Sequence, residues 1–572
     1  GNARLGSRDL STSVEPMTAA SAVASEPMLR SRWLGRVTYR DAWALQQALF
    51  AHSGDDHLLM LEHPPVYTRG RSADIANILP AAAQAAEIID VDRGGDVTFH
   101  GPGQLVVYPI RSIEGKRGGG MADTSAYVSD VEQLIIDALA DLGLPGATRL
   151  NGFPGVWLEA QGSRPRKIAA IGVRLSRGRT MHGFALNVST DLAWFDNIVP
   201  CGLTDKSVTS LVAEGIDVDM KAVVDVVSRL AAERWAPDGG SERQDVVWRH
   251  RSTDLSVFSR RAGGENLGEG TSVRLTSRLN EAGVTEGLEI RSRKPEWLRV
   301  KAEMGAEYRE LKKTINDLDL VTVCEEAGCP NIYECWSDGT ATFMINGERC
   351  TRACGFCLVD TRKPNPVDEH EPQRIATAVA QMKLTYAVLT TVARDDLADG
   401  GASGFVATIN AIRERTPGVG VEVLISDCEG IESSLDAIFS ARPVVLNHNV
   451  ETVARLQRAV RPSASYARSL SVLARAKAQG LTTKSSLMVG IGETYDEMVA
   501  TLADLAAIGT DIVTIGQYLR PTSEHLPISR WWTPDEFEKL ASVGRQLGIG
   551  HVESSPLTRS SYHARQAADA TR

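Results

Sequence analysis

Six of the eight cysteines lie between positions 324 and 357, where they form two triplets. The first triplet is Cys324, Cys329 and Cys335, and the second is Cys350, Cys354 and Cys357. Three soft thiolates at such short spacing can converge on one metal centre, which suits an iron–sulfur cluster or zinc. The two triplets therefore predict two metal centres.

The number of ligands helps to separate these metals. A closed site needs four ligands, and each triplet supplies three. In the second triplet, a missing fourth ligand would leave one iron open to a substrate or cofactor. The alternative is structural zinc, because Cys-x2-Cys pairs such as Cys354 and Cys357 commonly bind it. That alternative predicts a nearby histidine or a second Cys-x2-Cys pair, and the sequence has neither there.

The second triplet stands in Cys350-Thr-Arg-Ala-Cys354-Gly-Phe-Cys357, which resembles the cluster loop of radical S-adenosylmethionine (SAM) enzymes. With the first triplet, which ends in Cys335-Trp, the resemblance narrows to the lipoyl synthase family over about residues 293–565. It implies two [4Fe–4S] clusters and SAM as cofactors. In that family a serine of an Arg-Ser-Ser-Tyr motif is the fourth ligand of the upstream cluster, which implies this role for Ser561.

An octanoyl chain offers only unactivated C–H bonds, so a cofactor must carry the chemistry. The resemblance implies that reductive cleavage of SAM gives a deoxyadenosyl radical, which abstracts hydrogen at C6 and C8. The upstream cluster would supply the two sulfurs. A serine oxygen is a weaker and harder ligand for iron than a thiolate, so we hypothesise that Ser561 makes one corner of that cluster labile. Asn447, Lys484 and Gln517 are expected to contact SAM.

A second set of reactive residues lies in the first half. Cys201 stands in a Pro-Cys-Gly turn, with Lys167 and His182 upstream. Each residue alone is ordinary, but together they are the parts of an activated thiolate. The stretch 93–104 is dense in glycine, which lets a backbone approach a ligand closely; the alternative is an irregular hairpin loop.

In this order, the segments resemble octanoyltransferase of the lipoyl-protein ligase B type, over about residues 33–250. The resemblance implies transfer of an octanoyl group from acyl carrier protein to a lysine of an apo lipoyl domain. Cys201 would form the octanoyl thioester, Lys167 would lower the pKa of its thiol, and His182 would lie beside the reacting groups. The residues expected to line the acyl site are Arg93, Gly94, Gly95, Thr98, His100, Ala170, Ile171, Gly172, Gly183, Phe184 and Ala185. The alternative, an ATP-dependent lipoate ligase on the same fold, needs no nucleophilic cysteine.

The elements that must position these residues follow from hydrophobic periodicity and turn signals. In the first half we predict helices at 39–50 and 128–142 and strands at 58–61, 88–91 and 105–110. The resemblance implies the α/β fold of biotin and lipoate protein ligases. In the second half the predicted helices are 308–315, 374–382 and 405–415, and the predicted strands are 386–391, 421–425, 444–447, 486–490 and 512–515. This alternation indicates a parallel sheet with its site at the carboxyl edge, and the resemblance implies a partial (β/α)6 barrel.

The chain has 572 residues, too many for one hydrophobic core. The predicted division is a disordered tail at 1–28, an octanoyltransferase domain at 30–250, a flexible linker at 251–290 and a lipoyl synthase domain at 291–572. An organelle transit peptide is the alternative for the tail, and its acidic residues Asp9, Glu15 and Glu26 argue against it.

The net charge of −10 gives no reason to expect a nucleic-acid partner, and the sequence has no long apolar run that would indicate a membrane span. Clustered cysteines indicate a reducing compartment, so we expect a cytoplasmic protein. The combined prediction is a bifunctional enzyme of lipoate biosynthesis. Its expected partners are octanoyl-acyl carrier protein, lipoyl domains of 2-oxoacid dehydrogenases, the glycine cleavage H protein, and an electron donor such as ferredoxin or flavodoxin. The alternatives are an adaptor without chemistry and a chain with one inactive half.

Overall fold

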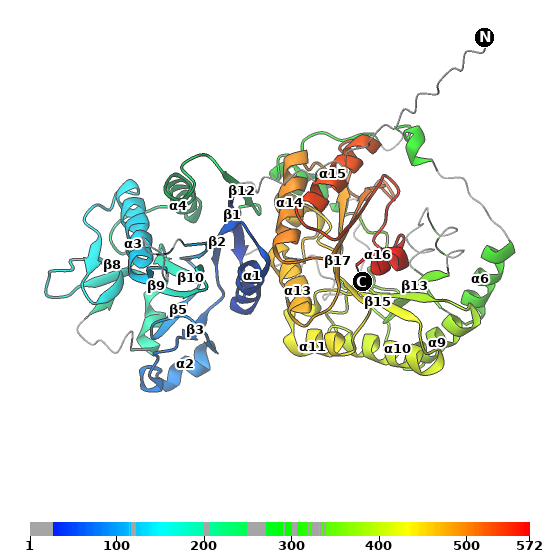
Figure 1. The fold of residues 1–572 in the computed structure, drawn as a ribbon, viewed down its shortest axis with the longest axis horizontal. Coiled ribbons are helices and arrows are strands. Elements are labelled where there is room, and N and C mark those ends of the chain that lie inside the picture. The colour runs from blue at the N-terminus through cyan, green and yellow to red at the C-terminus, as the bar shows by residue number, and fades with distance from the viewer. Residues whose placement is uncertain are drawn as a thin grey trace, which may run out of the picture.

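The computed structural model describes residues 27–113, 115, 122–199, 206–248, 270–289, 292–299, 306–318, 320–322, 331, 335 and 339–571. Figure 1 shows two bodies side by side, each built on its own large sheet. Several sequence predictions lie outside the described residues, namely those for Cys201, Cys324 and Cys329, for 251–269 of the linker, and for nearly all of the tail.

The first body has a nine-stranded sheet in the order β12-β1-β2-β6-β10-β9-β8-β7, with β11 paired to β9. Its strands are β1 (Leu29–Arg36), β2 (Asp56–Glu62), β6 (Gln104–Ile110), β7 (Thr148–Leu150), β8 (Phe153–Leu158), β9 (Arg166–Ser176), β10 (Arg179–Asn187), β11 (Ser207–Val208) and β12 (Ser241–Asp245). A smaller sheet, in the order β4-β3-β5, holds β3 (Val66–Arg69), β4 (Glu87–Asp90) and β5 (Val97–His100). The predicted strands at 58–61, 88–91 and 105–110 are confirmed as β2, β4 and β6.

Helices cover both faces of the large sheet. They are α1 (Tyr39–His52), α3 (Thr124–Asp141) and α4 (Met220–Trp235). Helix α2 (Pro80–Ala85) packs instead on the smaller sheet, where Ala82 is buried with Tyr67 and Phe99. The short turns are η1 (Ile75–Asn77) and η2 (Leu192–Asn197). Strands alternate their side chains between faces, so Leu58 and Met60 of β2 pack with α3 and α4, whereas Leu59 and Leu61 pack with α1. Both predicted helices are confirmed, as α1 and α3. The side chain of Thr38 begins α1 by accepting the backbone N–H of Asp41, a typical N-cap.

The second body holds one parallel sheet in the order β13-β14-β15-β16-β17-β18-β19. The strands are β13 (Thr340–Ile345), β14 (Tyr386–Thr391), β15 (Gly420–Leu424), β16 (Val445–Asn447), β17 (Thr483–Val489), β18 (Ile512–Gln517) and β19 (His551–Ser554). The helices are α9 (Glu371–Gln381), α10 (Ala402–Arg415), α11 (Glu432–Ser440), α12 (Gln457–Val460), α13 (Tyr466–Ala478), α14 (Tyr495–Ala507), α15 (Pro534–Gln546) and α16 (Ala564–Ala570). Helices α9 to α15 follow an arc outside the strands (Figure 1).

This arrangement agrees with the predicted partial barrel, because β13 and β19 are the two open edges of the sheet. The sequence prediction covered strands β14 to β18, with bounds that differ by up to three residues at one end. The final helix, α16, closes the inner side: Ala564, Ala567 and Ala568 are buried against Tyr386 and other inward-facing residues at the starts of the strands.

The expected flexible linker differs from the structure in its second part. Helix α5 (Gly270–Glu281) lies within the range 251–290, and Leu275 and Leu279 on one face of it are buried with residues of the barrel helices. Helix α6 (Ala306–Asp317) and the turn η5 (Glu296–Leu298) follow it. The glycines before α5 led to the prediction of a flexible linker. The helix is instead held on the second body by two leucines at helical spacing.

Within the described part of the chain, no helix combines the length and the apolar character that crossing a membrane requires.

Candidate active sites

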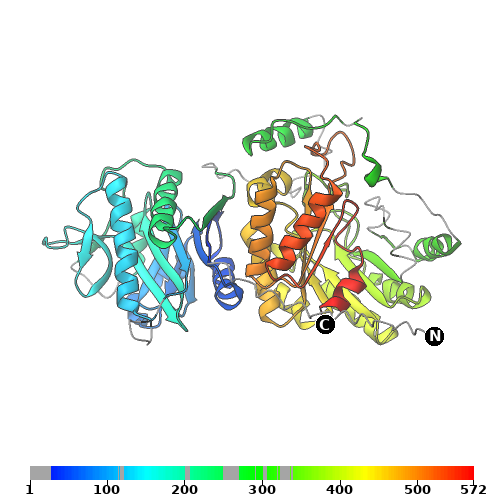
Figure 2. The same ribbon diagram turned by 45° about the horizontal axis from the view of Figure 1, so that its top comes forward.

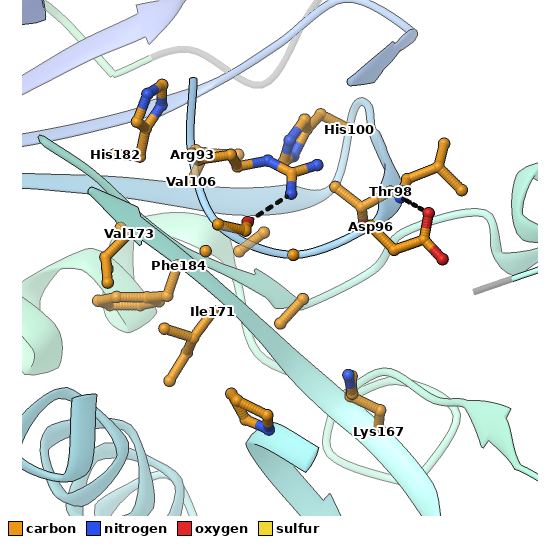
Figure 3. Close-up of a pocket in the computed structure, with 18 of the residues that line it drawn as sticks. Arg93, Asp96, Thr98, His100, Val106, Lys167, Ile171, Val173, His182 and Phe184 are labelled. Carbon is orange, nitrogen blue, oxygen red and sulfur yellow. Dashed lines mark hydrogen bonds between the residues drawn. The ribbon is translucent and has the colours of Figure 1, made fainter. Parts of the chain in front are cut away.

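A cavity of about 490 Å³ lies in the first body, where β9 and β10 meet the loop that follows β4 (Figure 3). All the residues expected at the acyl site line this cavity, as do Lys167 and His182. The lining is largely apolar around Phe184 and Ile171, which suits a short acyl chain, while polar side chains gather at its two ends.

Strand pairing explains why two separate predicted segments meet at this cavity. Strands β9 and β10 are antiparallel neighbours, with Gly172 opposite Gly183, Ile171 opposite Phe184, and Ala170 opposite Ala185. At position 183 only glycine fits, because a Cβ atom would overlap the carbonyl oxygen of Val107 on β6. The strands therefore form a closely packed floor beneath the ligand space.

Arg93 holds the glycine-rich loop over the cavity. Its Nη2 donates to the carbonyl oxygen and to Oγ1 of Thr68, both at 2.9 Å, and its Nη1 donates to the carbonyl oxygen of Gly94 at 3.0 Å. The guanidinium is buried, so these charge-assisted bonds fix the shape of the loop. Part of the stretch predicted as a loop is the strand β5.

His182 lies at one end of the cavity and is tied to a carboxylate. Its Nε2 is 2.8 Å from Oδ1 of Asp92, and its Nδ1 is 3.5 Å from the hydroxyl of Tyr39. Burial lowers the pKa of His182, although the hydrogen bond to Asp92 opposes this effect. The same hydrogen bond lowers the pKa of the Asp92 carboxyl. The pair therefore favours a neutral imidazole that donates from Nε2 to Asp92.

Lys167 lies at the other end of the cavity, where its Nζ is 4.7 Å from the centre of the Trp157 ring. His182 pairs with Val173, six residues along β9 from Lys167. At 3.3 Å per residue, this is a separation of about 20 Å along the strand, and Figure 3 places the two side chains apart. The structure thus differs from the expectation that His182 lies beside the reacting groups at Lys167, because the turn between β9 and β10 sends the chain back past Val173 first.

Cys201 lies outside the described residues, but the chain on either side of its segment is fixed. Before it, the N–H of Val199 donates to the carbonyl oxygen of Asn77 at 2.8 Å. After it, β11 runs beside β9, with Val208 opposite Lys167, and the N–H of Thr209 donates to the Lys167 carbonyl oxygen at 2.9 Å. The segment that carries Cys201 therefore ends beside Lys167 and not beside His182.

Sequence reasoning missed the polar wall around His182. This wall includes Tyr39 and Tyr108, with His63 behind them. The Nδ1 of His63 is 2.7 Å from the carbonyl oxygen of Val37, and its Nε2 is 2.7 Å from the Tyr108 hydroxyl. Burial lowers the pKa of His63 to about 4. The only sequence signal was a histidine at the end of an apolar strand, which was too weak to place it behind a cavity.

In the second body, the loop after β13 carries Cys350, Cys354 and Cys357 as free thiols. Burial raises the pKa of Cys354 to about 11, with the neighbouring Cys350 adding to the rise, and burial and Cys354 together raise the pKa of Cys357. Three half-buried thiols this close together fit a group that binds thiolates.

Backbone bonds and one ion pair network hold the cysteine loop. The N–H of Gly355 donates to the carbonyl oxygen of Val460 at 2.9 Å. Arg352 Nη2 is 2.8 Å from Asp395 Oδ1 and 2.6 Å from Asp427 Oδ1, and all three side chains are buried. The Arg352 charge of the loop is thus neutralised by two buried carboxylates.

The residues expected to contact SAM divide into two groups. Lys484 Nζ is 3.0 Å from Glu422 Oε1, and Asn447 Nδ2 donates to the same oxygen at 3.4 Å, in a fully buried network inside the barrel. The Oδ1 of Asn447 has no hydrogen-bond partner within the described residues, so it can accept a bond from a ligand. Gln517 is instead engaged by the protein, since its Oε1 accepts the N–H of Trp532 at 2.9 Å.

Ser561 lies in the turn that leads into α16. Asn331, which lies between Cys329 and Cys335 in the sequence, donates from Nδ2 to the carbonyl oxygen of Leu557 at 2.7 Å. Position 516 of β18 must also be glycine, because a Cβ atom there would overlap the carbonyl oxygen of Thr558. These contacts tie the C-terminal segment to the barrel and to Asn331.

Comparison with protein-family models gives three matches along the chain. The lipoyl protein ligase A/B catalytic domain matches residues 38–231, the N-terminal domain of lipoyl synthase matches 271–329, and the radical SAM superfamily matches 344–505. The fold and the two sites thus define a class: a ligase-like α/β domain joined to a radical SAM domain.

The curated relatives give the particular family. Lipoyl synthase of Rubrobacter xylanophilus is 53% identical over 281 residues, which are 49% of this chain and 88% of the relative. Lipoyl synthase of Chlorobaculum parvum is 54% identical over 274 residues, 48% of this chain and 94% of the relative. The chain belongs to the lipoyl synthase family through its C-terminal part. Membership implies [4Fe–4S] chemistry and SAM, and together with the ligase-like domain it places the chain in lipoate biosynthesis and lipoylation.

Solved structures with local likeness include a bipartite lipoate protein ligase from Thermoplasma acidophilum, at 15% identity and a TM-score of 0.32, covering 39% of this chain and 88% of that chain. Streptococcus suis SuiB bound to S-adenosylmethionine is 10% identical, with a TM-score of 0.32, covering 40% of this chain and 54% of that chain. With TM-scores below 0.5, neither likeness bears on function.

Proposed function

We propose that the chain is a bifunctional enzyme that carries out two consecutive steps of lipoate assembly. The first half transfers an octanoyl group from acyl carrier protein to a lysine of an apo lipoyl domain, and the second half inserts sulfur at C6 and C8. The observation that carries the proposal is that an acyl-sized cavity, lined by every expected acyl-site residue, precedes a lipoyl synthase domain in one chain.

In the first half, Cys201 attacks the thioester of the acyl donor and takes the octanoyl group. Lys167 favours the thiolate because an ammonium stabilises a nearby negative charge. The acyl chain extends along β9 and β10 from the Lys167 end toward His182. The approach of β11 to Lys167 supports this assignment, since the Cys201 segment ends at that strand. His182 and Asp92 then face the far end of the chain, and the two residues close the cavity there.

Trapping of the acyl-enzyme tests this half. Octanoyl-acyl carrier protein is mixed with the full chain, and intact mass spectrometry measures the adduct. We expect one octanoyl adduct on wild type and none on Cys201→Ser, whereas Cys428→Ser serves as a matched control and keeps the adduct. An ATP-dependent ligase would instead need ATP and the free acid. Normal adduct formation by Cys201→Ser would reject the thioester mechanism.

In the second half, we assign Cys350, Cys354 and Cys357 to one [4Fe–4S] cluster, and Cys324, Cys329, Cys335 and Ser561 to another. When bound, these groups supply reductive SAM cleavage and sulfur. Asn447 accepts a hydrogen bond from SAM at its unpaired Oδ1. Its Nδ2 donates to Glu422, which is paired with Lys484, and this network holds the amide in position.

Anaerobic reconstitution tests this assignment. We expect about eight irons per chain, the two-cluster value, together with release of deoxyadenosine. A Ser561→Cys variant is expected to keep its iron but to form product more slowly, because a thiolate holds iron more firmly than a hydroxyl. Four irons per chain, or zinc without SAM cleavage, would reject the two-cluster assignment.

The partners follow from these reactions. We propose octanoyl-acyl carrier protein as donor, lipoyl domains of 2-oxoacid dehydrogenases and the glycine cleavage H protein as acceptors, and a small electron donor such as ferredoxin or flavodoxin. A reducing cytoplasm would protect both clusters and the thiol.

A further inference from the structure

The two bodies meet over a surface that is packed like a protein interior. Helix α1 of the first body lies against α13 and α14 of the second (Figures 1 and 2). Leu45 and Leu49 of α1 belong to the same buried cluster as Leu470 and Leu473 of α13. The ring of His52 at the end of α1 rests against Gly509, where a side chain would crowd it.

A buried ion pair lies at one side of this surface. The guanidinium of Arg32 on β1 donates from Nε to both carboxylate oxygens of Asp504 on α14, at 3.0 and 2.9 Å. The Tyr466 hydroxyl donates to the same carboxylate at 2.8 Å. Glu242 of β12 pairs with the other side of Arg32. Only 3% of the Arg32 side chain and 8% of the Asp504 side chain are exposed.

A second anchor has the opposite polarity. Asp41 of α1 accepts bonds from Arg468 Nε at 3.1 Å, Ser471 Oγ at 3.0 Å and Arg475 Nη2 at 3.1 Å. All three donors are on α13, and the Asp41 side chain is 4% exposed. One anchor thus places a cation from the first body against an anion of the second, and the other anchor does the reverse, which fixes the register of the two surfaces.

We propose that this surface is a permanent docking interface, which holds the acyl-transfer half on the outer helices of the barrel without help from the connection through residues 249–269. Separation would take the Arg32 guanidinium from Asp504 and the Arg468 and Arg475 guanidinium groups from Asp41, although Arg32 would keep Glu242 of its own body. Breaking buried pairs in this way is unfavourable. Exposed ion pairs would not have this effect, because they contribute little to association. The two reaction sites therefore keep fixed positions, and a carrier domain must travel between them.

Cleavage of the connection tests the proposal without relying on activity. A protease site is inserted within residues 251–269 of the full chain, the purified protein is cut, and sedimentation velocity measures its size. We expect the cut protein to sediment as one particle at micromolar concentration and below. Separation of the cut wild-type protein at tens of micromolar would overturn the proposal.

Substitutions on each side of the surface test whether the buried ion pair causes the association of the two bodies. Cut Asp504→Ala and cut Arg32→Ala are each expected to associate about 100-fold more weakly. Arg32→Ala leaves the buried Asp504 carboxylate without this cation, and Asp504→Ala takes from Arg32 one of its two carboxylate partners. Replacing both partners, as Arg32→Met with Asp504→Leu, is expected to recover association because no charge is left unpaired. Lys221→Ala, which breaks the exposed Lys221–Asp225 pair on α4, is the matched control and should leave association unchanged. If both single variants associate as tightly as wild type and show normal circular dichroism before cutting, the ion pairs do not hold the two bodies together.

Discussion

The histidine behind the acyl cavity, His63, is a buried side chain whose surroundings favour one protonation state. His63 is fully enclosed, and its Nδ1–H donates to the carbonyl oxygen of Val37 while its Nε2 accepts from the Tyr108 hydroxyl. Both ring nitrogens are thus satisfied only by the neutral tautomer. A proton added to Nε2 would replace an acceptor with a second donor in a site without water contact, so acid should weaken this wall of the cavity.

The pH dependence of stability tests this view of His63. The folded pKa of about 4 lies below the ordinary value of about 6.5, so the unfolded chain binds more protons between these values. The contribution of His63 is complete above about pH 6.5 and is lost as the pH falls toward 4, by about 3 kcal/mol. We expect the thermal midpoint of His63→Gln to fall less steeply with acid than that of wild type. His370→Gln, at an exposed histidine, should not change the slope; equal slopes for all three proteins would contradict the assignment.

Helix α1 serves both halves of the molecule. Its first residue, Tyr39, lines the acyl cavity, and two residues later Asp41 binds three side chains of α13. The N-cap Thr38 also donates to Asp41 Oδ2, at 2.7 Å. The start of the helix is therefore fixed by the second body, and the position of the Tyr39 wall depends on that contact.

A substitution at Asp41 should therefore weaken binding of the octanoyl donor in the acyl cavity. Asp41→Asn keeps the shape of the side chain but removes the carboxylate that Arg468 and Arg475 share, which leaves Arg475 with Glu432 at 3.6 Å. The first turn of α1 should therefore loosen. We expect KM for the octanoyl donor to rise about fivefold, or about 1 kcal/mol, with a smaller change in kcat. Steady-state kinetics of the first half measures both constants.

The matched control is Asp219→Asn, which makes the same replacement at the N-cap of α4 on the opposite face of the sheet, where asparagine still caps the helix. Its KM should equal that of wild type. An unchanged KM in Asp41→Asn would show that the docking contact does not position Tyr39.

At the scale of the whole molecule, docking and covalent connection should both keep the octanoylated carrier near the second site. Two sites in one particle raise the effective concentration of an intermediate that is released from the first. If docking is sufficient, cutting the chain should have little effect, and only cutting combined with a broken anchor should separate the steps.

The rate of lipoyl product formation over a dilution series tests this expectation. For uncut protein and for cut wild type, the turnover per enzyme should hold steady on dilution, while cut Asp504→Ala should lose turnover progressively. A separate assay of each half confirms that the variant has both activities. If all three proteins lose turnover equally, the intermediate diffuses freely and proximity has no role.

The sequence by itself determined the reactive groups and much of the local structure. Closely spaced cysteines and the glycine-dense loop carry their information in nearby residues, since ligand spacing and glycine content are local properties. The segments at 170–172 and 183–185 were expected only because of the family resemblance. The predicted strands and helices were correspondingly close to the observed ones. Local patterns did not predict α5, because its few apolar residues favour a helix only when the barrel surface covers them.

Only the tertiary structure decided how far apart these groups lie. Lys167 and His182 are on adjacent paired strands, yet the turn between β9 and β10 puts them at opposite ends of one cavity. Nor could the sequence pair Arg32 with Asp504, or Asp41 with Arg468, across more than 400 positions. A single sequence gives each charged residue many oppositely charged candidates, and burial upon docking selects one of them because an unpaired charge at that surface is unfavourable.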